Sequence, residues 1–373
     1  MKILYIGHYK ENSGWSQCAL NNIAALYKSD VDLVCRNVKL TESTCNLPEY
    51  IKELENKNLN DIDYCIQHVL PHHITGTDRF KKNIGYFVHE LDSIKYHQWY
   101  HNLELLDQIW VANNDQKASL INDGFATDKL KVVPHTFDMS SYDKGLGKIS
   151  FDRQNNNFKF YFVCEIDDRK NIDSIIRCFH SEFHSSEPVS LILKIKRSGI
   201  DPESLRSGIR KLCNEVKSGM RLYPELQDYH EEIIITENFT DEQMRILHSS
   251  CDCYVGPTHG EGWGIPAFDA MCYGNTPICS NEGGPKEYID SHNKNTGWLV
   301  NGIMGICNHR NAAFKDLFTG RNHWFVPDET EIKKAMRYYY ENRDVDTRSD
   351  GLKQGKKFSY NKFASLVKEI LND

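Results

Sequence analysis

The sequence predicts an α/β protein with two domains, each holding a parallel β-sheet covered by helices on both faces. Three observations predict this fold. Strand-like apolar runs alternate with amphipathic helical stretches along the whole chain, which is typical of parallel sheets buried on both sides. A chain of 373 residues is too long for one ordinary core and suits two. Its polar, turn-rich middle, residues 139–157, has the composition of a linker.

The first half of the chain carries the first set of predicted strands. Each is a short apolar run bounded by polar or turn-forming residues, and the strands are expected at 2–9, 31–38, 62–69, 83–90, 108–114 and 130–136. Helical stretches separate them, for example at 17–27 and 116–122. These elements are expected to form an N-terminal domain that spans residues 1–145.

The second half resumes the alternation after the linker, in a domain expected to span residues 146–345. Thr240 and Gln243 have the spacing of a capping box at the start of a helix. Residues 303–322 break the rhythm and are expected to form an insertion or a loop. The strands of this domain are expected at 158–166, 190–197, 231–238, 251–258 and 276–281.

The C-terminal segment, residues 346–373, is expected to be helical and to pack back on the N-terminal domain. An apolar face of this kind has to be buried, so the last helix must dock on another part of the chain. The apolar side chains that recur at helical spacing are Phe363, Leu366, Val367, Ile370 and Leu371.

The composition favours a soluble, cytoplasmic protein. A net charge of −7 and an isoelectric point near 6.2 give no overall attraction to nucleic acid or to an anionic membrane. No apolar run reaches the length of a membrane span, and the apolar stretch at the N-terminus is too short for a signal peptide. Peripheral contact with a membrane surface is compatible with these features.

The twelve cysteines are scattered through apolar segments without a CxxC spacing. Disulfides are rare in reducing compartments, and a chain of this size does not need them. Free cysteine packs like a small apolar residue. We therefore expect buried free thiols, no disulfide framework and no structural zinc.

The stretch GEGWGIPAFDAMCYGN, residues 260–275, indicates a ligand site. Glu261 lies between two glycines and Asp269 follows in the same stretch, a pattern that core packing does not require. The stretch comes directly after the predicted strand 251–258. In doubly wound sheets, ligands bind beyond the carboxyl ends of the strands, so both carboxylates are expected at such an edge.

The helix that follows this loop is expected to begin at Pro266, with Asp269 in its first turn and Gly274 as its C-terminal cap. Carboxylates accept hydrogen bonds from sugar or ribose hydroxyls, and free amides at a helix start bind phosphate or sugar oxygens. We therefore expect a polyol-phosphate site, unless Glu261 merely satisfies loop amides and Asp269 merely complements the helix dipole. The free amides would be those of Trp263, Gly264 and Ile265.

Residues 259–289, HGEGWGIPAFDAMCYGNTPICSNEGGPKEYI, resemble the signature of retaining, nucleotide-sugar-dependent glycosyltransferases, in the large family (glycosyltransferase family 4 like) that includes bacterial mannosyl- and glucosyltransferases. That family carries Glu, seven residues, a second Glu, a small-residue helix with Gly, and a later Gly-Gly-x-x-Glu. Asp269 stands in place of the second Glu, and the matching residues are Glu261, Gly274, Gly283, Gly284 and Glu287. The stretches 107–125, 131–138 and 167–183 extend the resemblance over most of the chain.

The resemblance implies the GT-B architecture, in which two Rossmann-like domains face each other and a C-terminal helix crosses back to the first. It implies that Glu261 binds hydroxyls of the donor sugar and that Asp269 binds the ribose of the nucleotide. Lys170 matches the basic residue that contacts the diphosphate. Where the family usually has an Arg, residues 164–165 of this chain are Cys and Glu, and Arg169 or Lys196 is expected to substitute.

Simpler readings exist for the basic and N-terminal residues. Lys170 could be a solvated charge at a helix start, although the helix dipole does not favour a cation there. His89, in the run 83–90, matches a histidine that touches the donor sugar, but a histidine at a strand end is more often structural. Gly14 matches a flexible loop that faces donor phosphate or acceptor, but a plain turn also needs a glycine.

The resemblance implies a retaining glycosyltransferase that moves a sugar from a UDP- or GDP-sugar to a hydroxyl of a glycan, a lipid-linked glycan or another acceptor. Glu261, His89 and Lys170 are its expected catalytic residues. No cofactor and no metal are expected, since the carboxylate pair Asp61 and Asp63 stands at a strand entrance. The alternatives are a related subunit that binds nucleotide or glycan without catalysis, and a transferase acting on nucleic-acid bases, which the acidic balance disfavours.

Overall fold

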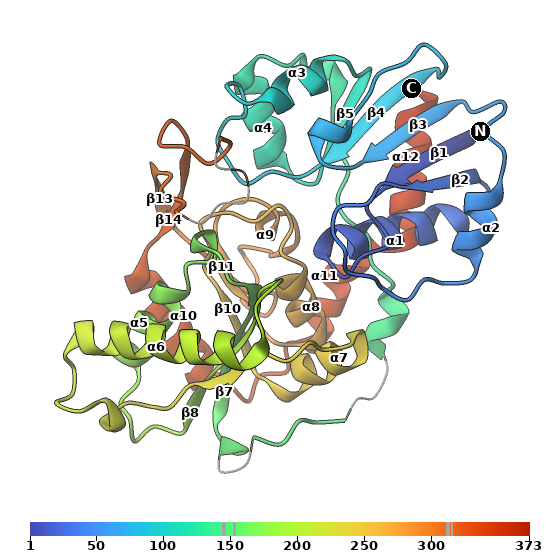
Figure 1. Cartoon of the computed structure of the whole chain (residues 1–373). Coiled ribbons are helices and arrows are strands. Elements are labelled where there is room, and N and C mark those ends of the chain that lie inside the picture. Colours follow the sequence, from blue (N-terminus) through green and yellow to red (C-terminus); the bar gives the residue numbers. More distant parts are fainter. Residues whose placement is uncertain (144–146, 152–153, 311–313, 315) are drawn as a thin grey trace. The chain divides into compact units, whose positions relative to one another are not determined.

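The computed structural model describes residues 1–143, 147–151, 154–310, 314 and 316–373. It divides the chain into two compact units, one formed by Met1–Ser141 with Lys356–Asp373 and the other by Tyr142–Gly355. Each unit is built on a six-stranded parallel sheet with helices (Figure 1), so the predicted α/β class is confirmed. The domain boundary expected between residues 145 and 146 falls outside the described residues.

The first unit has the strand order β2-β1-β3-β4-β5-β6, and all neighbouring strands run parallel. Because the order reverses beside β1, the carboxyl edge around this strand is the usual place for a ligand in a doubly wound sheet. Five strands fall within predicted apolar runs, and β4 begins one residue before its run: β1 (Lys2–Gly7), β2 (Asp32–Asn37), β3 (Tyr64–His68), β4 (Lys82–Phe87), β5 (Gln108–Val111) and β6 (Leu130–Val132). The connecting helices are α1 (Gly14–Tyr27), α2 (Tyr50–Asn56), α3 (Gln98–Glu104) and α4 (Asn114–Asp123).

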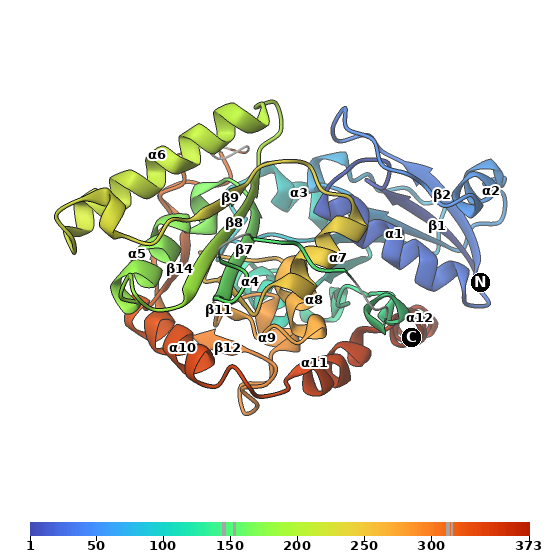
Figure 2. The same ribbon diagram turned by 90° about the horizontal axis from the view of Figure 1, so that it is seen from below.

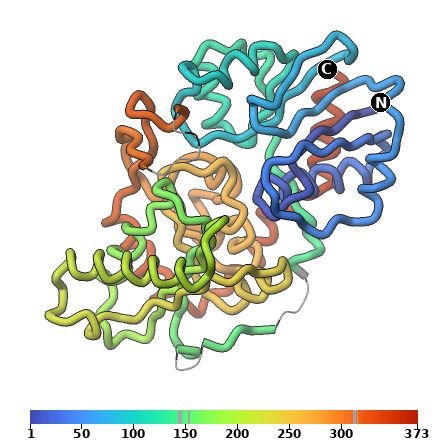
Figure 3. The backbone as a smooth tube through the Cα atoms, viewed as in Figure 1, coloured from blue at the N-terminus to red at the C-terminus, as the bar shows by residue number. Residues whose placement is uncertain are grey.

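The C-terminal helix α12 (Tyr360–Asn372) completes this first unit. It packs against α1, and the red C-terminal end of the chain lies among the blue elements of the unit in Figure 3. The Tyr64 hydroxyl donates to the carbonyl of Leu371 at 2.8 Å, and the Tyr360 hydroxyl donates to Asn21 Oδ1 at 2.7 Å. Its predicted apolar face is buried at Phe363, Val367, Ile370 and Leu371.

The second unit has the strand order β12-β11-β10-β7-β8-β9, again with parallel neighbours. The short β12 was not expected from the sequence. The strands are β7 (Phe158–Glu165), β8 (Val189–Lys196), β9 (Ile233–Ile235), β10 (Cys253–Gly256), β11 (Ile278–Ser280) and β12 (Trp298–Val300). The helices are α5 (Ile172–Glu182), α6 (Pro202–Met220), α7 (Asp241–Ser250), α8 (Ile265–Tyr273), α9 (Pro285–Tyr288), α10 (Glu329–Glu341) and α11 (Arg348–Gly355).

An antiparallel hairpin follows β12, formed by β13 (Gly302–Ile306) and β14 (His323–Pro327). The expectation of a loop or insertion over 303–322 is therefore wrong for its first residues. Two glycines in the five residues of β13 give it a low strand propensity, and Ile303 is 72 % exposed. β13 is stabilised by its pairing with β14, and no local sequence pattern predicts this pairing. Residues 311–313 and 315 lie outside the described part.

The helix termini follow the sequence signals closely. Thr240 and Gln243 form the predicted capping box at the start of α7. Gly274 caps α8 at its C-terminus with a left-handed φ of 88°, as expected. Pro266 is the second residue of α8 and not the first, because the helix begins at Ile265. As a result Asp269 lies beyond the first turn of this helix, which corrects the expectation.

Helix α11 packs closely against α8, as Figure 2 shows. A Cβ atom at Gly351 would lie 2.0 Å from the carbonyl oxygen of Met271, so only glycine fits there. A Cβ atom at Gly274 would lie 2.9 Å from the Cβ of Arg348. These contacts hold the N-terminal end of α11 directly over the end of α8.

All twelve cysteines are free thiols, and only Cys45 is not buried. The expectation of buried free thiols therefore holds for the other eleven. No helix among the described residues is long and apolar enough to span a membrane.

Shortening one side chain of α12 tests its part in the core of the first unit. Leu371 is 2 % exposed, and Leu371→Ala should lower the free energy of unfolding by roughly 2–5 kcal/mol, since a buried leucine loses its contacts and leaves a cavity. Urea denaturation measures the change. Glu369→Ala, at an exposed position of the same helix, is the control. Equal denaturation midpoints for the two variants would contradict the packing described here.

Candidate functional site

The loop between β10 and α8 places Glu261 beyond the carboxyl end of β10, which is a central strand of the second sheet. Its backbone is held by the Gly283-Gly284 pair: the N–H of Gly284 donates to the carbonyl of Glu261 at 2.9 Å. A Cβ atom at Gly283 would lie 2.2 Å from that same carbonyl oxygen. The close approach therefore requires glycine at position 283.

Two cations reach Glu261 from the loop after β7, the strand that neighbours β10. Lys170 Nζ lies 2.6 Å from Glu261 Oε1, and Arg169 Nη1 lies 3.9 Å from Glu261 Oε2. Arg169 also donates to the carbonyl of Gly260 at 2.5 Å. The three charged side chains are only 14–18 % exposed, so they form one largely enclosed charge cluster.

The charge cluster determines the protonation state of the Glu261 carboxyl group. Burial alone would raise the pKa of its carboxyl group, because a charged group is poorly solvated there. Lys170 and Arg169 outweigh that effect and lower the pKa below its ordinary value. Glu261 is therefore ionised at neutral pH, with one negative charge facing two positive charges.

The two loops are joined by backbone contacts as well as by the ion pair. The N–H of His259 donates to the carbonyl of Arg169 at 2.8 Å, and Asn171 Nδ2 donates to the carbonyl of Pro257 at 2.9 Å. Asn171 takes a left-handed conformation with φ of 54°, which places the loop before α5. Lys170 and Glu261 are thus positioned by a common scaffold and not by their side chains alone.

His309 and His259 support this scaffold, and the sequence pattern did not reveal either of them. His309 Nε2 lies 2.7 Å from Asp167 Oδ1, and its side chain is 1 % exposed. Asp167 in turn accepts a hydrogen bond from the N–H of Arg169 at 2.8 Å. His259 stacks on Trp324 of β14, with ring centroids 4.2 Å apart. His309 and Trp324 therefore connect the hairpin region to the loops that carry Arg169, Lys170 and Glu261, and stabilise their positions.

The glycine-rich start of α8 divides into a packed part and an accessible part. The Trp263 ring is 3 % exposed and packs against Tyr288 and Phe268, at centroid distances of 5.4 and 6.1 Å. Gly264 is the N-cap, with φ of 83°, and Ile265 is the first helical residue. Because the first N–H groups of a helix have no partner within it, only the backbone here suits a ligand.

Asp269 does not join the charge cluster in the structure. Its Oδ1 accepts a hydrogen bond from the hydroxyl of Tyr142, a residue 127 positions earlier in the chain. Burial raises the pKa of Asp269 to about 7, although the Tyr142 hydrogen bond opposes this rise. The carboxyl group therefore titrates near neutral pH, unlike that of Glu261.

Lys196 is the last residue of β8 and is partly exposed. It lies opposite Glu165, the last residue of β7, in the register of the two strands. It thus stands at the same edge of the second sheet as the cluster. Of the two residues expected to substitute for the family's Arg, Arg169 is the one that the structure shows beside Glu261.

His89 and Gly14 belong to the first unit. β4 ends at Phe87, so His89 lies two residues beyond the strand and not at its end. Its ring stacks on Phe87 with centroids 5.7 Å apart, and burial lowers its pKa to about 4. His89 is therefore neutral at physiological pH. Gly14 is the first residue of α1, directly after its N-cap Ser13, and the contacts of both residues with a donor stay predictions.

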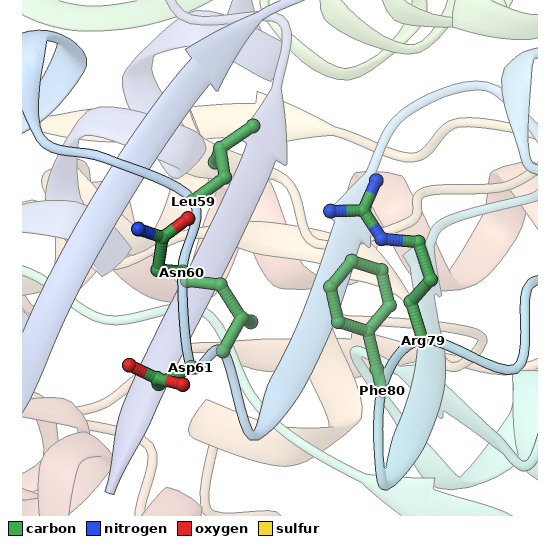
Figure 4. Close-up of a pocket in the computed structure, with 6 residues that line it drawn as sticks. Leu59, Asn60, Asp61, Arg79 and Phe80 are labelled. Atoms are coloured by element: carbon green, nitrogen blue, oxygen red, sulfur yellow. The ribbon is translucent and has the colours of Figure 1, made fainter.

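A separate pocket of about 500 Å³ opens at the amino ends of β3 and β4. Figure 4 shows Arg79 and Phe80 on one side of it, with Leu59, Asn60 and Asp61 on the other. The neighbouring Asp63 pairs with Lys81 at 2.7 Å and accepts from the N–H of Lys2 at 2.8 Å. This edge is opposite to the carboxyl edge where such sheets bind ligands.

Removing the nearest cation tests the charge balance at Glu261. With Lys170→Met, burial is opposed only by Arg169, so the pKa of Glu261 should rise. In the wild type the lowered pKa contributes stability above the ordinary value of 4.5, and this contribution is lost as pH falls. The variant should therefore lose most stability near pH 7 and least near pH 4.

Urea denaturation across that pH range measures the difference. Lys334→Met, at an exposed position of α10 in the same unit, is the matched control. A stability loss for Lys170→Met that did not change with pH would show that the pairing has no influence on the Glu261 carboxyl group.

Comparison with known proteins matches part of the second unit to a family and the whole chain to a fold. Residues 224–302 match the family model described as "Glycosyl transferases group 1". The matched segment includes both Glu261 and Asp269 but not Lys170 or Arg169. A search of curated proteins finds no match.

The chain is similar to several solved structures over its whole length. HepE from Anabaena in complex with UDP-glucose has a TM-score of 0.64 at 13 % identity, covering 100 % of this chain and 99 % of that one. Sucrose-phosphate synthase from Thermosynechococcus elongatus has a TM-score of 0.63 at 14 % identity, covering 100 % and 98 %.

A third structure, "Trehalose-6-phosphate from E. coli bound with UDP-2-fluoro glucose", has a TM-score of 0.67 at 9 % identity, and the similarity covers 100 % of this chain and 99 % of that one. At such identities the likeness concerns the fold. The chain therefore has the GT-B fold, and its residues 224–302 carry the pattern of the glycosyl transferases group 1 family.

Proposed function

We propose that the protein is a retaining glycosyltransferase that transfers a sugar from a nucleoside-diphosphate sugar to an acceptor hydroxyl. The observation that carries this proposal is the buried Glu261 carboxylate flanked by Lys170 and Arg169 at the carboxyl end of a parallel sheet. Glu261 also lies within the segment that matches the glycosyl transferases group 1 model. Solved structures with the same fold hold UDP-glucose or a fluorinated analogue, which makes UDP-glucose the first donor to test.

The charge cluster can bind both the sugar and the diphosphate of such a donor. An ionised carboxylate accepts hydrogen bonds from sugar hydroxyls, and charge-assisted hydrogen bonds are the stronger ones. Lys170 carries three N–H donors, so it can keep its bond to Glu261 and still bind a phosphate oxygen. Arg169, which is 3.9 Å from Glu261, supplies the second positive charge for the diphosphate.

The reaction breaks the bond between C1 of the sugar and the diphosphate oxygen, which keeps the electron pair. Fixed cations and helix-start amides stabilise the charge that develops there without having to reorganise. The acceptor oxygen bonds to C1 from the leaving-group face, and a leaving phosphate oxygen takes its proton. Configuration at C1 is thereby retained.

A second candidate is a related protein that binds nucleotide or glycan without catalysis. The observation that favours it is the state of Asp269, which is one methylene shorter than the family's Glu and already accepts a hydrogen bond from Tyr142. Activity with a substituted Glu261 distinguishes the two candidates, because a binding protein transfers no sugar in either form.

Donor choice is best found with a panel of UDP-, GDP- and ADP-sugars, scored first by thermal stabilisation of the protein. With the donor that stabilises it, transfer or donor hydrolysis should be measurable. Glu261→Ala should reduce this activity roughly a hundredfold, since the hydrogen bonds of a buried charge are lost. Glu341→Ala, at an exposed position of α10, is the control and should keep full activity.

Turnover should not change when EDTA is added. Lys170 and Arg169 take over the neutralisation of the diphosphate that Mg²⁺ performs in metal-dependent transferases. The assay compares initial rates with and without the chelator at saturating donor. A rate that falls with EDTA and recovers with added Mg²⁺ would contradict this part of the proposal.

A further inference from the structure

Tyr142 is the first residue of the second unit and is held at three points. Its side chain is 4 % exposed, and its ring packs on Tyr273 with centroids 5.2 Å apart. Its carbonyl oxygen accepts a hydrogen bond from Arg348 Nη2 at 2.7 Å. Arg348 is itself placed by the close approach of α11 to Gly274, so the position of Tyr142 is determined by the packing of α8 and α11.

The third point is the hydroxyl group, which donates to Oδ1 of Asp269. The residue Asp269 keeps partial exposure, and no hydrogen bond to its Oδ2 occurs within the part of the chain that the structure describes. One oxygen is therefore occupied and fixed, whereas the other is available. A carboxylate held in this way presents a single acceptor in a defined direction.

We propose that Tyr142 is a positioning residue for the nucleotide: its hydroxyl fixes one oxygen of Asp269 so that the other accepts a ribose hydroxyl of a nucleoside diphosphate. This inference rests on the proposed function, because it needs a nucleotide at the start of α8. Tyr142 does not touch the ligand in this arrangement. It acts through Asp269, whose Oδ1 it holds.

The same hydrogen bond affects the charge of Asp269. Burial raises the pKa of its carboxyl group to about 7, and the Tyr142 hydroxyl opposes this rise. Without that hydroxyl the pKa should move higher, so less of the group is ionised at neutral pH. The titratable and charged groups whose interactions reach Asp269 are Tyr142, Tyr161, Asp241, Arg245, Cys272, Tyr273 and Tyr288.

The test is the binding of UDP to Tyr142→Phe, measured by calorimetry between pH 6 and 9. At pH 7 the affinity should fall roughly tenfold relative to the wild type, and the rise of affinity with pH should shift to higher pH. The deoxy analogue of UDP that lacks the bound ribose hydroxyl should bind both proteins equally. Tyr339→Phe, which loses a partly buried hydrogen bond from its hydroxyl to the carbonyl of Lys294, is the control and should match the wild type.

Asp269→Asn keeps Tyr142, so it tests the site even if Tyr142→Phe does not fold: it removes the charge and should weaken UDP binding and abolish its pH dependence. Where Tyr142→Phe folds, combining it with Asp269→Asn should cause little further loss. Equal affinity and equal pH profiles for wild type and Tyr142→Phe would overturn the inference while leaving the proposed function intact. The inference would also be overturned if Tyr142→Phe lowered the affinity for UDP, 2′-deoxy-UDP and 3′-deoxy-UDP by the same factor.

The proposed function fails on a different result. If the folded wild-type protein binds none of the uridine, guanosine and adenosine diphosphates, nucleotide binding itself is absent, and the inference falls with it. If the wild type binds a nucleoside diphosphate and Tyr142→Phe binds it equally well, the inference about Tyr142 fails while the proposed function stands.

Discussion

The ion pair between Lys170 and Glu261 is the interaction on which the organisation of the second unit's ligand edge depends. Enclosing a carboxylate is costly unless a cation lies beside it, and here the cation comes from the loop of the adjacent strand. The pairing therefore requires β7 and β10 to be neighbours and their loops to approach closely. Gly283 and Gly284, in the loop after β11, hold the Glu261 loop from its other side, because a side chain at either position would collide with the backbone of the Glu261 loop.

Much of this fold can be predicted from sequence, because its signals are local. Strands of parallel sheets are continuous apolar runs, and caps such as Thr240 with Gln243, or Gly274, depend on a few adjacent residues. The hairpin of β13 and β14 has no such signal, since β13 is largely exposed and contains glycine. The start of α8, by contrast, is predictable to within one residue, because Gly264 and Pro266 are local signals.

The site was accessible to sequence reasoning only in part. The grouping of Lys170 with Glu261 follows from their places at the ends of neighbouring strands. The partner of Asp269 does not, because Tyr142 is 127 residues away in a segment with no regular pattern. Likewise His309 supports Asp167 from beyond β12. Such contacts are decided by tertiary packing, which leaves no periodic trace in the chain.

The place of α12 in the fold has a consequence for how the protein is made. The first unit takes its last helix from the final residues of the chain, after the whole of Tyr142–Gly355. On the ribosome, the apolar surface of α1 that α12 covers must stay open while the second unit is synthesised and folds as a separate body. An interrupted or prematurely ended chain would carry that open surface permanently, which makes it a natural substrate for chaperones and proteases.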